Sequence, residues 1–413
     1  MDLDTIIDHG GYYMNVAILG FGTVGSGVYE VLHMNHSYIA KCAGNELNVK
    51  YVLDLRDFPG HPVSDILTHD INDIINDDDV DIVAEVMGGE NPAYEYTKKA
   101  LEKGKAVITS NKELVSKHGS ELLALAKENN TNYFFEASVG GGIPIIRPIN
   151  RSLTADDILE IRSIINGTTN YILTRMRDER MDFAEALKEA QDNGFAERNP
   201  AADIEGLDAA RKTAILASLV NQTQVECDDI YTEGITAISA ADIAYASRLK
   251  AKIKLISLIR RIDGKTYACV TPLMLSKKCQ LFNVDGVYNA VMVKGNAVGD
   301  LMFFGSGAGK LPTASAVVGD IVEAAKHRHI NVVTIWEPEV LKLADIDDLE
   351  YNFFVRVPAR DSEKAREHMR IDIIVDAGIP GEFAFVTESM SGREFRTRSE
   401  GLEIISRIRT ELA

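Results

Sequence analysis

The sequence is poor in basic residues. Lys and Arg number 44 against 62 Asp and Glu, which gives a formal net charge of −18. Proteins that bind a nucleic acid backbone do so through clustered basic side chains that release its counterions, and this composition opposes such binding. We therefore expect no nucleic acid partner.

Cysteine is scarce and long apolar runs are missing. No stretch approaches the ~18 apolar residues of a membrane-spanning helix, and the start MDLDTIID lacks the basic region of a secretory signal. The cysteines lie far apart with no C-x-x-C pair, which argues against a disulfide framework and a zinc knuckle; they are Cys42, Cys227, Cys269 and Cys279. We expect a cytoplasmic protein without a membrane partner.

What is present suits an ordinary globular protein of two or three domains, with 413 residues, of which 46% are hydrophobic and 26% charged. Short apolar runs at 16–19, 49–53, 82–86 and 106–108 alternate with helical or polar segments. This alternation predicts a Rossmann-type, doubly wound parallel sheet. The run 65–81 carries seven Asp and no Lys or Arg, and we interpret it as a solvated helix and loop.

The pattern changes beyond residue 132. Runs at 158–165 and 267–275 suit strands and runs at 183–193 and 207–219 suit helices, which predicts a second domain of α+β type. An acidic, linker-like stretch at 337–350 precedes strand-like FFVRV, IDIIV and EFAFVT and a helical LEIISRIRTEL. From residue 351 to the end, ten Lys and Arg stand against eleven Asp and Glu, so the composition shift supports a boundary near residue 350.

A glycine-rich turn follows the first predicted strand and opens a helix. It fits G-x-G-x-x-G with Gly20, Phe21, Gly22, Thr23, Val24 and Gly25. Glycines let the backbone turn tightly and approach a pyrophosphate, which then lies at the helix N-terminus, so we predict dinucleotide binding. Asp54, after the second strand, would bond the ribose of NAD, whereas Arg56 could meet the 2′-phosphate of NADP. The sequence offers both.

A second glycine turn, GSGAGKLP, does not fit a phosphate-binding P-loop. That motif needs a glycine where Phe304 stands and a hydroxyl where Leu311 stands. The turn either packs near the cofactor or only initiates the helix that begins around Pro312.

The densest polar cluster is GFAERNPAADIEGLDAARK. It contains Glu197, Asp203, Glu205, Asp208 and Lys212, with Asp208 and Lys212 four residues apart on one helical face. Such pairs often only keep an exposed helix face soluble, but here turns at Asn199-Pro200 and Gly206 interrupt the run before the helix. Several carboxylates with one lysine suit a ligand that carries an ammonium group and a proton-transfer step by the lysine.

Lys112 in ITSNKELV follows a strand at the carboxyl edge of the predicted nucleotide sheet, where open α/β sheets bind ligands, although a solvated lysine is an equal alternative. None of the cysteines lies in the glycine or acidic motifs, so a thiolate nucleophile is disfavoured. The nine histidines form no H-E-x-x-H spacing, which leaves zinc catalysis without support.

Seven motifs together resemble homoserine dehydrogenase, in order from about residue 14 to about 335. They are GFGTVGSGV, AEVMGGENPA, ITSNKELV, FEASVGGGIPII, INGTTNYIL, GFAERNPAADIEGLDAARK and GAGKLPTASAVVGD. The resemblance implies reversible, NAD(P)-dependent interconversion of L-homoserine and L-aspartate 4-semialdehyde in threonine and methionine biosynthesis. It also implies a homodimer or homotetramer that assembles through the second domain.

The resemblance implies roles for individual residues. Lys212 would give a proton to the aldehyde oxygen, Lys112 would lie beside nicotinamide and substrate, and Glu197 would hold the substrate ammonium. Asp203 and Asp208 would orient substrate and lysine, with Gly167 and Thr168 lining the site. Phe21, Thr23, Val24 and Gly309 match cofactor contacts. A monovalent cation, usually Na+, would be bound by Glu136 and the backbone carbonyls of Val139, Gly141 and Ile143.

The resemblance also implies the domain organisation. It comprises an N-terminal extension (1–13), a nucleotide-binding domain (14–140 plus 310–335), a substrate-binding and dimerisation domain (141–309), a linker (336–350) and a C-terminal ACT-like, ferredoxin-like domain (351–413). FFVRVPARDSEKAREHMR lacks the glycine that usually follows the first ACT strand, which puts regulation by threonine in doubt. Two rival functions are a catalytically silent nucleotide sensor and a 2-hydroxy-acid or amino-acid dehydrogenase.

Overall fold

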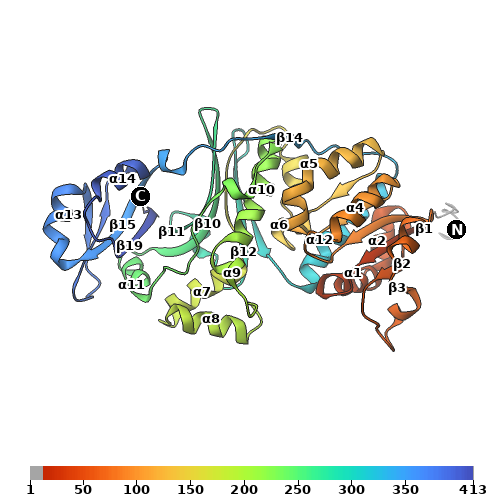
Figure 1. The fold of residues 1–413 in the computed structure, drawn as a ribbon, viewed down its shortest axis with the longest axis horizontal. Helices are drawn as coiled ribbons and strands as arrows, with labels where there is room; N and C mark the ends of the chain where they lie inside the picture. The colour runs from red at the N-terminus through yellow and green to blue at the C-terminus, as the bar shows by residue number, and fades with distance from the viewer. Residues whose placement is uncertain (1–12, 413) are drawn as a thin grey trace, which may run out of the picture. The chain divides into compact units, whose positions relative to one another are not determined.

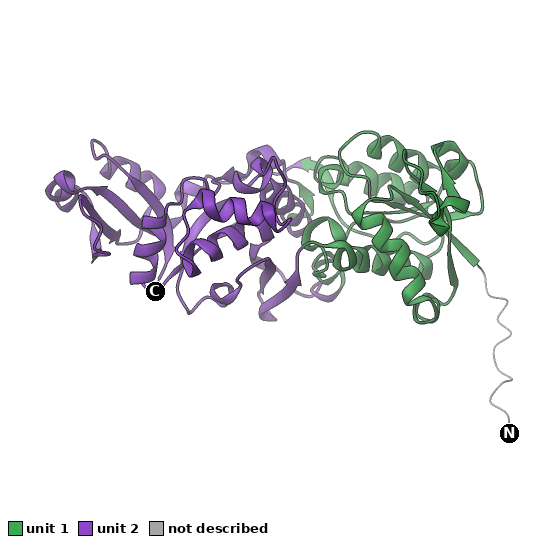
Figure 2. Ribbon diagram, turned by 90° about the horizontal axis from the view of Figure 1, so that it is seen from below, with its two compact units in different colours: residues 1–151, 221–224, 308–339 green, residues 152–220, 225–307, 340–413 purple. Residues whose placement is uncertain are grey.

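The computed structural model describes residues 13–412, which divide into two units (Figure 2). The first unit comprises 1–151, 221–224 and 308–339, and the second comprises 152–220, 225–307 and 340–413. The predicted N-terminal extension lies, apart from Tyr13, outside the described residues. No helix within residues 13–412 is long and apolar enough to cross a bilayer.

The first unit is built on a parallel sheet of six strands within the described residues (Figure 1). In spatial order they are β3 (Leu67–Thr68), β2 (Glu46–Leu53), β1 (Tyr13–Leu19), β4 (Val80–Glu85), β5 (Ala106–Thr109) and β6 (Tyr133–Phe134). The strand order reverses between β1 and β4, which is the switch point where doubly wound sheets bind ligands. The predicted strands of this sheet are confirmed, with ends shifted by a few residues.

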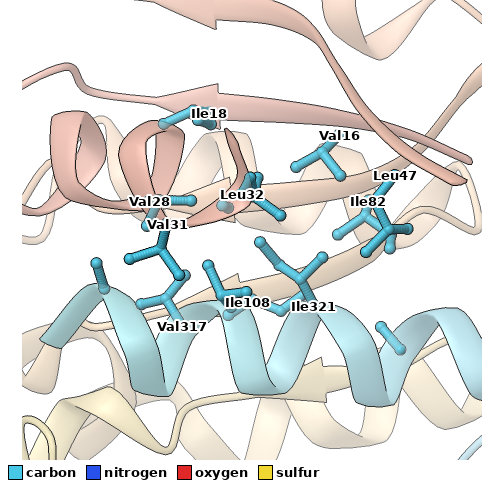
Figure 3. Close-up of a cluster of buried hydrophobic side chains, with 14 of the residues drawn as sticks. Val16, Ile18, Val28, Val31, Leu32, Leu47, Ile82, Ile108, Val317 and Ile321 are labelled. Atoms are coloured by element: carbon cyan, nitrogen blue, oxygen red, sulfur yellow. The ribbon is translucent and has the colours of Figure 1, made fainter. Parts of the chain in front are cut away.

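Helices connect these strands and cover the sheet. They are α1 (Thr23–Met34), α2 (His36–Ala43), α3 (Ile71–Ile75), α4 (Ala93–Glu102), α5 (Lys112–Glu128) and α6 (Ala137–Gly140). A later segment, α12 (Lys310–Lys326), joins the same core. Figure 3 shows Val317 and Ile321 of α12 in one apolar layer with Val31 of α1 and Ile108 of β5. This burial ties residues far apart in the sequence to one sheet.

The acidic run 65–81 is only partly the solvated surface that we predicted. The side chain of Asp81 is 10% exposed; it accepts a hydrogen bond from the backbone N–H of Asn15 and pairs with Arg328. Asp77 pairs with Lys50 at 2.7 Å. The prediction fails for these residues because their partners come from distant segments, which a local run of like charges does not reveal.

The second unit contains a larger mixed sheet. Its main strands, in spatial order, are β13 (Gly299–Ser306), β12 (Tyr288–Gly295), β7 (Ile158–Ile164), β10 (Lys252–Ile262), β11 (Lys265–Leu275), β19 (Ser406–Glu411), β15 (Glu350–Pro358), β17 (Glu382–Thr387) and β16 (Ile371–Val375). Two short strands lie off this path, β9 (Tyr231–Thr232) beside β11 and β18 (Met390–Ser391) beside β15. The helices are α7 (Gly167–Asp178), α8 (Phe183–Asp192), α9 (Ala201–Ile204), α10 (Leu207–Asn221), α11 (Ala240–Arg248), α13 (Ser362–His368) and α14 (Gly392–Arg398).

The C-terminal residues continue this sheet. The order β15, α13, β16, β17, α14, β19 is a βαββαβ succession, and β19 lies between β15 and β11. One apolar core runs from Ile256 and Leu273 to Val355, Phe385 and Phe395. The stretch predicted as a linker is not wholly irregular, since β14 (Glu337–Val340) pairs with β8 (Thr223–Gln224).

The prediction of a helix at LEIISRIRTEL is wrong. Residues 406–411 form β19, which pairs parallel with β11 and antiparallel with β15. Ile408 is buried there in a register that places Arg409 opposite Leu273. Pairing with two distant strands outweighs the helical spacing of the local apolar residues, because strand preference depends on cross-strand packing.

Candidate functional site

The glycine turn between β1 and α1 is closed on one side and open on the other. A Cβ added to Gly25 would lie 1.9 Å from the carbonyl oxygen of Gly20, whereas a Cβ on Gly22 would have no described atom within 4 Å. Gly20 has φ +93°, which favours glycine. In the described chain no side-chain hydrogen bond caps α1. Its first N–H groups therefore suit an anionic ligand.

Asp54 and Arg56 lie against this turn. Asp54 accepts a hydrogen bond from the backbone N–H of Phe21 at 2.7 Å and pairs with Arg56 at 2.9 Å. Arg56 also donates to the carbonyl oxygen of Phe21 at 3.2 Å. The side-chain hydrogen bond from Arg56, assisted by backbone donors, holds the pKa of Asp54 well below its usual range. The structure thus brings both predicted ribose-reading residues to the glycine turn and joins them to each other.

The loop after β4 meets the same turn. A Cβ on Gly20 would lie 3.0 Å from Cγ of Met87. Below this loop, Glu85 is buried, accepts hydrogen bonds from the N–H of Met87 at 2.9 Å and from Thr109 Oγ1 at 2.6 Å, and has a pKa raised by burial. Glu85 therefore links the carboxyl ends of β4 and β5.

Lys112 is the first residue of α5, directly after β5. The residue before it, Asn111, caps the helix by accepting from the N–H of Leu114 at 3.2 Å and donates to the carbonyl oxygen of Gly89 at 2.6 Å. These two hydrogen bonds hold the turn before Lys112. The backbone of Lys112 therefore lies at the carboxyl edge of the sheet, the position that the sequence predicts.

Gly309 precedes α12 with φ +121°. A Cβ added to Gly27 of α1 would lie 2.7 Å from the carbonyl oxygen of Lys310 and 3.0 Å from Cβ of Ala314. The first turn of α12 therefore packs directly on α1. GSGAGKLP thus initiates a helix, since α12 begins directly after Gly309, and the start of that helix packs on the helix that follows the glycine turn.

The predicted cation ligands lie around α6, where the side-chain carboxylate of Glu136 accepts hydrogen bonds from protein N–H groups. Glu136 is 1% exposed and accepts hydrogen bonds from the backbone N–H groups of Ile145, Ile146 and Arg147 at 2.5, 2.8 and 2.7 Å. Both carboxylate oxygens of Glu136 thus face N–H donors, which leaves the backbone carbonyls of this turn as the oxygen atoms that a cation could meet. Residues 13–412 contain no group of three His, Cys, Asp or Glu that could hold a metal ion.

The acidic motif of the second unit gathers around Lys212. Its ammonium donates to the carbonyl oxygen of Ile165 at 2.9 Å and pairs with Asp208 at 2.9 Å. The side chains of Lys212 and Asp208 are 11% and 8% exposed. Asn166 donates from Nδ2 to Asp203 at 2.7 Å and to Asp208 at 3.0 Å. One amide thus joins two of the predicted carboxylates beside the predicted lysine.

The other predicted residues lie in the neighbouring turns. Gly167 begins α7, where a Cβ would lie 2.8 Å from the carbonyl oxygen of Val287. Thr168 donates to the carbonyl oxygen of Phe195 at 2.6 Å. Glu197 is exposed in the loop between α8 and α9 and is held through its backbone carbonyl by Gln191 at 3.0 Å. The structure brings Asp203, Asp208 and Lys212 together but leaves Glu197 on the surface.

Asn166 and Ile165 are the site residues that the sequence analysis missed. Asn166 also accepts from the N–H of Thr169 at 2.9 Å and so caps α7. An asparagine that precedes a helix is a recognisable N-cap signal, but its second role, as donor to two carboxylates, is set by the fold.

The cysteines do not offer a nucleophile. All four are free thiols. Burial raises the pKa of Cys269 to about 12 and also raises the pKa values of Cys227 and Cys279. A raised pKa keeps a thiol protonated and unreactive, in line with the sequence interpretation.

Comparisons with known proteins agree over most of the chain. The family model of the homoserine dehydrogenase NAD-binding domain matches residues 20–136, and that of homoserine dehydrogenase matches 144–322. Homoserine dehydrogenase of Bacillus subtilis is 42% identical over 358 residues, which are 84% of this chain and 82% of that protein.

Solved structures agree as well. The homoserine dehydrogenase of Thiobacillus denitrificans is 33% identical, with a TM-score of 0.88 over 97% of this chain and 99% of that one. A hyperthermophilic archaeal homoserine dehydrogenase, solved in complex with NADPH, is 30% identical, with a TM-score of 0.63 over 76% of this chain and 98% of that one.

Proposed function

This chain belongs to the homoserine dehydrogenase family, and we propose that Lys212 exchanges the proton of its reaction. The reaction is the reversible, NAD(P)-dependent oxidation of L-homoserine to L-aspartate 4-semialdehyde. When bound, the nicotinamide supplies or accepts the hydride. The protein must then hold the substrate and give or take a proton at its C4 oxygen.

The contacts of Lys212 support this role. An ammonium group has three N–H donors, and Ile165 and Asp208 accept two of them at 2.9 Å. The proposal assigns the third to the aldehyde oxygen of the semialdehyde, which takes this proton during reduction. During homoserine oxidation the neutral amine takes the proton of the hydroxyl group. Low exposure strengthens a charged donor, because water competes less with the substrate for it.

The carboxylates around Lys212 support recognition of an amino acid. We propose that Glu197 holds the substrate ammonium, that Asp203 and Asp208 orient substrate and lysine, and that Gly167 and Thr168 line the site. The bonds from Asn166 fix two of these acids before substrate arrives. Preorganised charges need little rearrangement during the reaction, which favours catalysis.

The glycine turn fits a dinucleotide, because the side of Gly22 is open and α1 lacks a side-chain cap in the described chain. The proposed contacts are Gly20 to Gly25, Lys112 and Gly309. Asp54 would favour NAD and Arg56 would favour NADP. Since each binds the other here, the proposal includes both cofactors.

Three further features stay proposals. A monovalent cation such as Na+ would be held by the backbone carbonyls of Val139, Gly141 and Ile143, while the Glu136 carboxylate shapes the turn. The βαββαβ succession of residues 350–411 supports an ACT-like, ferredoxin-like module. Exposed Tyr288 and Phe304 on β12 and β13 support a homodimer or homotetramer. The reaction itself supports a function in threonine and methionine synthesis.

Replacing the lysine tests the proposal. We expect Lys212→Ala to lower kcat for homoserine oxidation by about 10²- to 10⁴-fold, the usual contribution of a general acid or base, and to leave NADPH binding unchanged. Lys188→Ala is the matched control, because Lys188 forms the same i, i+4 pair with Asp192 but with side chains that are 72% and 65% exposed. Steady-state kinetics and NADPH fluorescence titration measure both effects. Full turnover by Lys212→Ala would sink the assignment.

A further inference from the structure

Glu233 lies where the C-terminal strand meets the sheet of the second unit. It follows β9, which pairs parallel with β11 at Cys269 and Val270. β19 pairs parallel with β11 further along, from Leu273 to Leu275. Since β10 pairs with the other edge of β11, β9 and β19 lie one after the other along a single edge.

Two arginines of β19 hold the Glu233 carboxylate. Arg407 donates to Oε1 at 2.5 Å and Arg409 donates to Oε2 at 2.7 Å. The hydroxyl of Thr271 donates to Oε2 at 2.6 Å. Arg409 is 2% exposed, and its cation also lies over the ring of Tyr231. The side chain of Glu233 is 32% exposed, so this ion pair is partly buried. It ties residue 233 to the C-terminal strand, and removing the Glu233 charge would leave the buried Arg409 cation less well compensated.

The residues after Glu233 contact residues 204–206, which form the turn between Asp203 and Asp208 and are called the acidic turn below. The N–H of Ile235 donates to the carbonyl oxygen of Ile204 at 2.8 Å. A Cβ on Gly234 would lie 2.2 Å from that same oxygen and 2.6 Å from Cα of Glu205. Only glycine therefore allows the two backbones to approach this closely.

Gly206 completes this contact. It has φ +85°, and a Cβ there would lie 3.0 Å from Cγ2 of Thr232. The turn 204–206 follows Asp203, the last acid of α9, and precedes Asp208, the first acid of α10. A shift of the segment 232–235 would therefore displace the carboxylates on both sides of the turn.

We propose that Glu233 is a positioning residue for the acidic turn, and that Arg407 and Arg409 make the C-terminal strand part of this support. The inference rests on the proposed function of Asp203, Asp208 and Lys212. It assigns the C-terminal module an effect on the substrate site of the same unit through one ion-paired carboxylate. The supporting contacts form a continuous series of hydrogen bonds and close backbone approaches.

Kinetics of Glu233→Gln tests the inference, because this change removes the charge and keeps the size. We expect the KM for homoserine to rise about three- to thirtyfold, the range of coupling through packed networks, while kcat and the KM for NADP+ stay within about twofold. Arg407→Gln, at a more exposed position, should act in the same direction. In the double variant the rise in the KM for homoserine, expressed as a free energy, should be smaller than the sum of the two single rises, because both changes break the same interaction.

Glu382→Gln is the matched control. Glu382 pairs with Arg356 at 2.6 Å in the same unit but bears no contact to the acidic turn among the described hydrogen bonds and ion pairs. It should leave the KM for homoserine unchanged. A wild-type KM for homoserine in both Glu233→Gln and Arg407→Gln would overturn the inference. A fall in kcat with an unchanged KM would also overturn it, because a merely structural role lowers only the fraction of active enzyme.

The two proposals can fail separately. If Lys212→Ala keeps full turnover, the proposed function fails whatever Glu233 does. If Lys212→Ala loses turnover while both Glu233→Gln and Arg407→Gln behave as wild type, only the positioning role fails. Thermal melting of each variant identifies any that do not fold. If Glu233→Gln does not fold, the change in the KM for homoserine relative to kcat is measured on Arg407→Gln instead.

Discussion

Asn166 is the side chain on which the substrate site of the second unit depends most. Its oxygen caps α7, and its amide nitrogen donates to Asp203 and Asp208. The sequence motif predicts the acids and Lys212, because their spacing and turn residues are local. It does not predict the asparagine's donor role, since residues 166, 203 and 208 belong to separate segments that meet only in the folded second unit.

A substitution separates the two roles of Asn166. Asn166→Ser keeps an oxygen that can cap α7 and replaces the amide, which donates to both carboxylates, with a shorter hydroxyl that has a single O–H donor, so at least one of the two hydrogen bonds is lost. A hydrogen bond to a charged group contributes about 1.5–3 kcal/mol, so we expect kcat/KM for homoserine to fall about 10- to 100-fold with little change in melting temperature. Asp182→Ser, which alters the cap of α8 in the same unit, is the control. Unchanged kcat/KM in Asn166→Ser would show that the amide does not organise the site.

Strands and helices show where local pattern suffices and where it fails. The turn from β1 to α1 is predictable, because the apolar run, the glycines and the helical spacing all lie within residues 16–32. β19 is not, because its apolar residues also fit a helix and only its pairing with β11 and β15 decides between the two. The same pairing brings Arg407 and Arg409 to Glu233.

Substitutions in the glycine turn between β1 and α1 test the proposed cofactor site. Gly25→Ala would bring a methyl group within 1.9 Å of the Gly20 carbonyl oxygen, so the turn must shift. We expect a lower melting temperature and NADPH binding weakened at least about tenfold, a loss of roughly 1.4 kcal/mol. Gly22→Ala has room in the fold and should weaken binding without lowering the melting temperature, since it fills the side proposed for the pyrophosphate. Normal NADPH affinity in Gly25→Ala, measured by calorimetry, would contradict the assignment.

Over the whole chain, each unit is organised around its own sheet. The charge of −18 agrees with the two proposed sites. In the first unit an anionic cofactor is proposed to meet backbone N–H groups, and in the second unit acidic residues lie beside Lys212. The shift in composition near residue 350 marks a segment with a βαββαβ order, yet its strands continue the sheet of the second unit. Composition can locate such a segment but cannot reveal strand pairing across more than a hundred residues.

The side-chain amine of Lys212 is the proposed acid and base of the homoserine reaction, and rescue of its loss by added amines tests this role. In Lys212→Ala the space beside Ile165 and Asp208 should admit a small primary amine. Methylamine or ethylamine should restore homoserine oxidation by Lys212→Ala in a saturable manner, while wild type and Lys188→Ala should not respond. Turnover of Lys212→Ala that is independent of added amine, at any level, would contradict the claim.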